Sequence, residues 1–128
     1  MQLLLDTQAL LWWLTADAAL SAQARKAIAD GGNNIYVSAA SAWEIATKHR
    51  LGKLSRAVII AADVEGAIKG QGFVSLPITV QHGQAAGSLP GSHRDPFDRM
   101  LIAQALLEKL VLVTNEKVFE SYGISRLW

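Results

Sequence analysis

The sequence contains no cysteine, which excludes disulfide bonds, thiolate metal sites and a cysteine nucleophile. No apolar run reaches the roughly 18 residues that a membrane-spanning helix needs. Residues 1–14 also lack the basic segment and the cleavage site of a signal peptide. These absences predict a cytoplasmic protein that has no membrane partner.

Charge is also scarce, since only 18% of the residues are charged and the net charge is +1 at pH 7. That balance by itself indicates no nucleic-acid partner, because proteins that bind nucleic acid through charge carry a basic excess. Hydrophobic residues make up 51% of the 128 residues, which argues against disorder. A chain of this length can bury about two-thirds of its unfolded surface. Residues 1–128 are therefore expected to form a single domain.

Short apolar runs alternate with segments of helical pattern along the whole chain. The runs expected to form strands are 2–5, 34–38, 73–78 and 111–114, with 124–128 as either a last strand or a tail. The segments expected to form helices are 7–15, 21–32, 39–54 (ending near Gly52), 57–72, 79–89, 95–110 and 115–123. This alternation predicts an α/β fold, a three-layer α/β/α sandwich with a central, mainly parallel sheet.

Five acidic residues stand where strands end or helices begin. They are Asp6 after the first strand, Glu44 in the helix after the second, Asp95 and Asp98 before the fourth, and Glu116 after the fourth. In such sheets, ligands bind beyond the carboxyl ends of the strands. Carboxylates gathered there repel one another unless a cation or protons neutralise them. Oxygen ligands of this kind suit Mg²⁺ or Mn²⁺.

The pair Asp95 and Asp98 also has a purely structural interpretation. Asp95, Pro96 and Asp98 fit the start of a helix, with Asp95 as N-cap, proline in the first position and Asp98 beside the positive end of the dipole. Capping and metal binding are both open for this pair. The two roles are compatible if Asp95 caps the helix and Asp98 points into the cleft.

The other three acids have structural alternatives as well. Asp6 is placed to cap the helix that follows it. Glu44 can complete a capping box with Ser41 or form an ion pair with Lys48, four residues later. Glu116 can interact with the dipole of a short helix. Taken singly, each acid is better explained by these roles, so a metal site depends on the fold that brings the acids together.

Four blocks of the sequence carry a resemblance to a known family. They read "LLLDT.ALLWWL", "VSAASAWEIATKHRLGKL", "HRDPFDRMLIAQA" and "LVTNEKVFESYG", and together they resemble PIN-domain ribonucleases, in particular VapC-type toxins of toxin–antitoxin pairs. The match covers nearly the whole chain in order and spacing, with residues 54–92 matching more loosely. The resemblance implies the α/β/α sandwich already predicted. It also implies an acidic site that binds Mg²⁺ or Mn²⁺ and cleaves single-stranded or loop RNA.

The resemblance assigns a role to each of the five acids. It makes Asp6, Glu44 and Asp98 members of the metal site and adds Asp95 as an extra member of the same ligand set. The fourth acid of the family falls in a motif similar to Thr-Asn-Asp, where this chain has Glu116. The extra methylene leaves two roles open for Glu116, which either reaches the metal through water or lies outside the ligand set.

The resemblance also implies partners. Proteins of this kind form homodimers, and a cognate VapB-type antitoxin covers the acidic cleft with its tail. Trp12, Trp13 and Trp43 are expected in the core, although one of them is free to face a partner. Arg94 and Arg99 are candidates for contacts with the RNA substrate, and Arg99 has the alternative of pairing with a carboxylate. The basic run 48–53 is interpreted as a solvated helix face.

Two other functions compete with that of a ribonuclease toxin. The first is a catalytically inactive PIN-fold module that binds RNA or a protein partner, which the departure at Glu116 permits. The second is a receiver domain with an aspartate nucleophile, which would have an acidic pair after the first strand. Only Asp6 stands there, and this weighs against the receiver domain.

Overall fold

The computed structural model describes residues 1–54 and 58–128. A five-stranded sheet forms the centre, and every pairing between neighbouring strands is parallel. Its order is β3-β2-β1-β4-β5. The strands are β1 (Gln2–Leu5), β2 (Asn34–Ser38), β3 (Val74–Leu76), β4 (Val111–Val113) and β5 (Arg126–Leu127). The predicted α/β fold is confirmed, and the last segment forms a strand.

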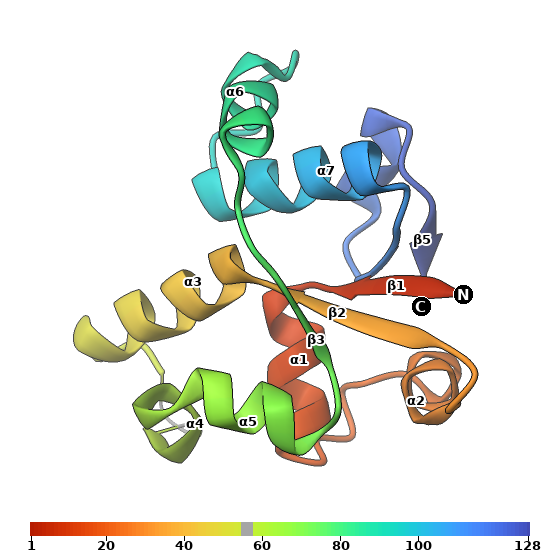
Figure 1. Cartoon of the computed structure of the whole chain (residues 1–128). Helices are drawn as coiled ribbons and strands as arrows, with labels where there is room; N and C mark the ends of the chain where they lie inside the picture. The colour runs from red at the N-terminus through yellow and green to blue at the C-terminus, as the bar shows by residue number, and fades with distance from the viewer. Residues whose placement is uncertain (55–57) are drawn as a thin grey trace.

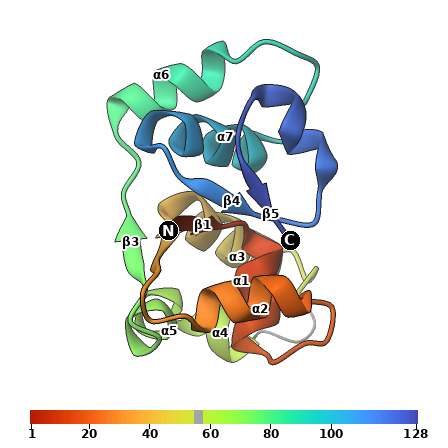
Figure 2. The ribbon, with the colours of Figure 1, turned by 90° about the vertical axis from the view of Figure 1, so that its right-hand side faces the viewer.

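Helices cover both faces of the sheet (Figures 1 and 2). The sequence of β1 explains why both faces must be covered. Leu3 and Leu5 pack into a core shared with α1 (Thr7–Leu14) and α2 (Ala22–Ala29). Leu4 packs on the opposite face against α7 (Pro96–Glu108). A strand buried on both faces reads as a continuous apolar run, as residues 3–5 do.

The remaining helices complete the two outer layers. They are α3 (Ala39–Arg50), α4 (Val58–Ala62), α5 (Val64–Gly70), α6 (Val80–Ser88) and the 3₁₀ helix η1 (Lys117–Tyr122). Figure 1 shows α4 and α5 on the same side of the sheet as α1, and α6 and α7 on the other side. Helix α3 packs against both α1 and α7 at the end of β2. No helix in the described ranges is long and apolar enough to cross a membrane.

One predicted helix is wrong in outline. The segment 57–72 was expected to be continuous, but it forms two helices that break at Asp63. The Asp63 carboxylate accepts a hydrogen bond from the backbone N–H of Gly66 and so caps α5. An N-cap residue has extended backbone, which interrupts the preceding helix. The first residue of the prediction, Ala57, lies outside the described residues.

The strand order sets where a site can form. The chain builds β1, β2 and β3 outward in one direction, and then returns to place β4 on the free side of β1. The order therefore reverses between β1 and β4, and ligand clefts of open α/β sheets form at such a point. A backbone hydrogen bond of 3.1 Å from Asp6 N–H to the Val113 carbonyl oxygen joins the two strand ends.

Candidate acidic site

Asp6 lies at this switch point, in the first position after β1. Its carboxylate accepts a hydrogen bond of 2.7 Å from the backbone N–H of Ala9, so Asp6 caps α1 as the sequence suggested. It also accepts a hydrogen bond from the Thr114 hydroxyl at the end of β4. The side chain is buried, with 6% exposed. Capping therefore holds Asp6 in place without removing it from the site.

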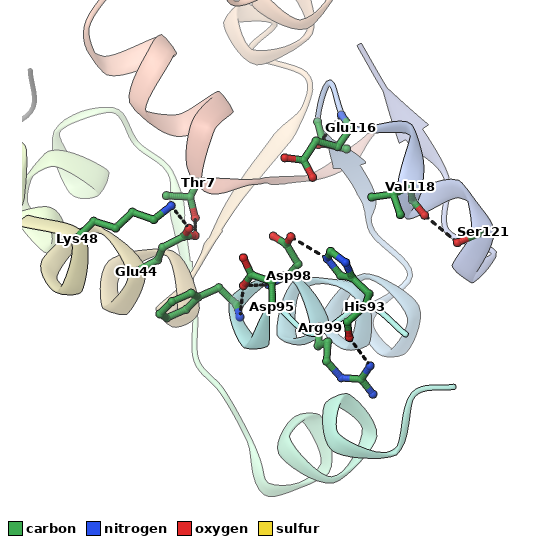
Figure 3. Close-up of polar contacts among 12 residues, drawn as sticks. Thr7, Glu44, Lys48, His93, Asp95, Asp98, Arg99, Glu116, Val118 and Ser121 are labelled. Carbon is green, nitrogen blue, oxygen red and sulfur yellow. Dashed lines mark hydrogen bonds and ion pairs between the residues drawn. The ribbon is translucent and has the colours of Figure 1, made fainter. Parts of the chain in front are cut away.

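Glu44 is held in the wall of the site by α3. The Thr7 hydroxyl donates to Glu44 Oε1 at 2.6 Å, and Ser41 Oγ lies 3.0 Å from the same hydroxyl. Glu44 Oε2 forms an ion pair with the Lys48 ammonium, four residues later on the helix (Figure 3). The predicted ion pair is thus present, but the predicted capping box with Ser41 is wrong. Ser38 is the N-cap of α3, and Glu44 lies well inside the helix.

The start of α7 presents Asp95 and Asp98. Asp95 caps the helix, since its carboxylate accepts the backbone N–H groups of Phe97 and Asp98 at 2.9 and 3.2 Å. Asp98 is half-buried and points away from the cap, with its Oδ2 2.9 Å from His93 Nε2 (Figure 3). The predicted cap at Asp95 is confirmed, and the Asp98 carboxylate takes no part in it and contacts His93 instead.

Glu116 approaches from the opposite wall, two residues after Thr114. Figure 3 shows its side chain directed from the end of β4 toward the gap in which the Asp98 carboxylate lies. The Glu116 backbone N–H donates to Thr114 Oγ1 at 3.1 Å, and this hydroxyl in turn donates to Asp6. The side chain of Glu116 is exposed, so it can turn without disturbing the core.

The carboxylates influence one another electrostatically. The pKa of Asp6 is raised from its ordinary 3.8 to about 6, mainly by burial and also by the charges of Glu116 and Asp98, against the hydrogen bonds that lower it. Burial likewise raises the pKa of Asp98 to about 6, with Asp95 and Glu116 contributing, although its hydrogen bond from His93 opposes the rise. Four acids therefore repel one another electrostatically, and a bound cation would reduce this repulsion. They are Asp6, Asp95, Asp98 and Glu116.

Lys48 is a cationic side chain that interacts with some of these acids. Burial lowers its pKa, but the hydrogen bond and charge of Glu44, together with the charges of Asp95 and Asp98, outweigh burial and raise the pKa above its ordinary value. Lys48 therefore interacts with the acids of both α3 and α7. Glu44 itself is turned toward Lys48 and Thr7.

The residues present fit a hard divalent cation by their chemistry. The site offers carboxylate oxygens, which Mg²⁺ and Mn²⁺ prefer, and two of its acids have pKa values that burial and like charge raise. In residues 1–54 and 58–128, no three His, Asp or Glu side chains are already arranged to hold one ion. Mg²⁺ retains several waters and needs few direct protein ligands.

Several residues near the site differ from the expectations. Lys48 was assigned to a solvated face and paired with Glu44, and only the fold shows that it also interacts with Asp95 and Asp98. Within residues 1–54 and 58–128 Arg99 pairs with no carboxylate: its guanidinium donates to the backbone carbonyl oxygens of Ala86, near the end of α6, and of Leu89 in the loop that follows. Trp43 does not enter the core, because 58% of it is exposed, and it contacts the Phe97 ring edge-on at 4.7 Å.

The other two tryptophans behave as predicted. Trp12 and Trp13 are partly buried and pack against the core below the sheet. Trp13 also donates its indole N–H to the Gln71 side chain at 2.9 Å. His93 lies in the loop that precedes α7. Its contact with Asp98 places it beside the site.

Comparison with solved structures agrees with this architecture. VapBC2 from Rickettsia felis, bound to a DNA fragment from its promoter, matches with a TM-score of 0.71 and 14% identity over 100% of both chains. DNA-bound VapBC from Salmonella typhimurium matches with a TM-score of 0.72 and 19% identity, over 98% of this chain and 96% of that chain. The PIN domain endonuclease Utp24 matches with a TM-score of 0.55 and 17% identity, over 98% and 90%. Identities this low show a shared fold.

The sequence comparison defines the family. No curated protein matches this sequence significantly. The family model of the PIN domain matches residues 3–124, which include all five acids of the site. This match also removes the receiver-domain alternative, and the chain belongs to the PIN domain family.

Proposed function

We propose that this protein is a divalent-metal-dependent endoribonuclease that acts as the toxin of a toxin–antitoxin pair. The observation that carries the proposal is the placement of Asp6 and Asp98, two acids with pKa values raised to about 6, at the switch point of a PIN domain. PIN domains are typically magnesium-dependent nucleases. Acids with raised pKa values in a cleft are candidates for function rather than stability.

Asp6 and Asp98 would hold Mg²⁺ or Mn²⁺, with Glu44, Asp95 and Glu116 in supporting positions. When bound, the cation supplies charge neutralisation for the phosphodiester and lowers the pKa of a water molecule. The Thr114 hydroxyl orients the Asp6 carboxylate, and His93 orients that of Asp98. These contacts preorganise the site before substrate binds.

The reaction is hydrolysis of a phosphodiester bond. Water adds to phosphorus, the bond to the 3′ oxygen breaks, and that oxygen takes up a proton, which leaves a 5′-phosphate and a 3′-hydroxyl. Lys48 carries the positive charge that the chain itself contributes beside the acids, and its side chain is only partly buried. It can therefore contact a phosphate of the substrate as well as Glu44.

The partners follow from the same proposal. The solved neighbours include VapBC complexes, so we propose a VapB-type antitoxin as the protein partner and a homodimer as the assembled toxin. Cationic side chains of a partner segment would satisfy the carboxylates electrostatically in the inhibited state. RNA in the cytoplasm is the proposed substrate.

The decisive experiment is cleavage of end-labelled total RNA by purified protein freed of any antitoxin. Lanes with Mg²⁺, Mn²⁺ and EDTA are compared, and Asp98→Asn is the site variant. We expect discrete cuts that need the metal and disappear in the variant. Cuts that Asp98→Asn leaves unchanged would exclude this site. Metal binding by calorimetry without cleavage of any RNA would favour the alternative of an inactive binding module.

A further inference from the structure

A cavity of about 820 Å³ lies next to the acidic site. Its walls are the loop 89–94, Leu106 of α7, and Val118, Ser121 and Tyr122 of η1. The volume lies in the range of roughly 300–1,000 Å³ that small-molecule sites occupy. None of the five acids lines it. The cavity is therefore separate from the acidic site, although the two are adjacent.

His93 joins the cavity to the acidic site. One side of its imidazole contacts Asp98 at 2.9 Å, and the same residue forms part of the cavity wall. Figure 3 shows Asp98 on one side of His93, and Val118 and Ser121 on the other. A group bound in the cavity would thus lie one side chain away from a phosphate at the acids.

The lining combines apolar surface with a few polar groups. Leu106 and Val118 are 41% and 45% exposed, which leaves apolar surface open to a ligand. Arg94 is exposed at the edge and carries a guanidinium. The Ser121 hydroxyl donates to the Val118 carbonyl at 2.8 Å, so its oxygen remains able to accept a hydrogen bond.

The close packing of Tyr122 against the loop in the cavity wall depends on Gly91. Gly91 has φ +93°, and a Cβ there would meet the Tyr122 hydroxyl oxygen at 3.0 Å. Glycine thus permits both the backbone conformation and the close approach of the loop to the Tyr122 ring. The ring is only partly buried, and its body packs against the core formed with α7.

We propose that this cavity is a subsite for one unpaired nucleobase of the substrate RNA, next to the phosphate that is cleaved. Unpaired bases are recognised by stacking on aromatic rings or guanidinium planes, together with hydrogen bonds to the base edge. These groups are offered by Tyr122, Arg94 and Ser121, next to the apolar surface of Leu106 and Val118. The subsite selects RNA that is single-stranded at the cut, since a paired base cannot enter. This inference rests on the proposed function.

The first test uses the four free nucleosides, because they carry no phosphate and need neither metal nor cleavage. Adenosine, guanosine, cytidine and uridine are titrated at millimolar concentrations into ¹⁵N-labelled protein in EDTA. We expect at least one nucleoside to shift the amide signals of residues 91–94 and 118–122. Absence of shifts with all four, or shifts confined to other residues, would overturn the subsite.

The variants Val118→Asp and Leu106→Gln place polar groups in the cavity at positions exposed enough to be tolerated. The control is Val80→Asp, which changes an apolar residue that is 89% exposed and lies outside the lining. We expect each cavity variant to weaken nucleoside binding and to lower kcat/KM for RNA by about tenfold, the order of one lost base contact. The control should do neither.

The outcomes separate the subsite from the nuclease. Nucleoside shifts without any RNA cleavage would support the cavity and count against the proposed function. Cleavage that both cavity variants leave unchanged would support the nuclease and overturn the subsite. A third outcome is that none of the four nucleosides binds, while a bound partner protein protects the cavity residues from hydrogen exchange. The cavity would then be a protein-docking surface, which also overturns the inference.

Discussion

At the scale of single residues, the buried negative charge of Asp6 lowers the stability of the folded protein at neutral pH. The carboxylate is buried, and its pKa of about 6 means that the folded state disfavours its charged form at neutral pH. It is nonetheless retained as the cap of α1, where an asparagine would serve equally well. Helix capping alone therefore does not require the negative charge of Asp6.

Asp6→Asn should stabilise the metal-free protein at pH 7. The folded pKa lies above the unfolded value of 3.8, so the folded state binds more protons and loses stability as the pH rises toward 6 and beyond. Removing the charge should raise the free energy of unfolding by about 1 to 3 kcal/mol. Urea denaturation in EDTA at several pH values measures the gain, which should shrink as the pH falls and be lost below 3.8. A variant less stable than wild type at pH 7 would contradict this account.

Thr7 provides the opposite case, a neutral side chain on which a buried charge depends. Its hydroxyl donates to Glu44 Oε1 at 2.6 Å, and Glu44 is only 6% exposed. Thr7→Val keeps the shape but removes this donor, so we expect the free energy of unfolding to fall by about 1 to 3 kcal/mol. Thr7→Ser keeps the hydroxyl and is the matched control. Equal stability of the valine and serine variants in urea denaturation would show that the bond contributes nothing.

At the scale of elements, the start of α7 combines a helix cap with a site residue. Asp95 accepts the backbone N–H groups of Phe97 and Asp98, and the cap fixes the direction in which Asp98 leaves the helix. Arg99 reinforces the arrangement from the other side, since it donates to the His93 carbonyl at 2.9 Å. The loop that carries His93 is thereby tied to the first turn of α7.

Asp95→Ala should cost about 0.5 to 2 kcal/mol of stability, because two backbone N–H groups lose their acceptor. Asp95→Asn should stay close to wild type in thermal unfolding, since asparagine caps a helix as well as aspartate does. Calorimetric Mg²⁺ titration of the asparagine variant then isolates the charge. A lower affinity would make Asp95 part of the metal site, and an unchanged affinity would leave it as a cap alone.

At the scale of the whole molecule, the sheet brings together acids that are up to 110 positions apart, Asp6 and Glu116. The parallel order places the ends of β1 and β4 side by side. Helices α3 and α7, which pack against each other, bring Glu44 and Asp98 to the same edge. The site is therefore a product of the complete fold, and an ion bound there should stabilise the folded chain as a whole.

Mg²⁺ should raise the melting temperature of the wild-type protein, and the gain should grow with the logarithm of the Mg²⁺ concentration above the Kd. An ion that binds only the folded state adds about 1.4 kcal/mol at ten times its Kd. Asp98→Asn should remove most of this gain, and EDTA should reverse it. Glu65→Gln is the control, because Glu65 is a surface carboxylate with 75% of its side chain exposed. An equal Mg²⁺ effect in wild type and Asp98→Asn would contradict the assigned site.

Much of the fold could be predicted because local signals were strong. The strands at residues 2–5 and 34–38 have the predicted bounds, since each is a short apolar or β-rich run that ends at a polar residue. The break at Asp63 was missed because one capping residue inside an apolar segment is a weak signal. The capping box offered for Ser41 and Glu44 is absent because α3 begins at Ala39, after the N-cap Ser38, so both residues lie inside the helix.

By itself, the sequence determined the α/β class and the helix caps at Asp6 and Asp95. These features depend on neighbours within a few residues, so the local pattern carries them. Tertiary structure alone decided that Lys48 interacts with Asp95 and Asp98, that Arg99 binds carbonyl oxygens, and that His93 links Asp98 to a cavity. The physical reason is that each of these contacts depends on how helices and loops pack across the edge of the sheet, which no local pattern encodes.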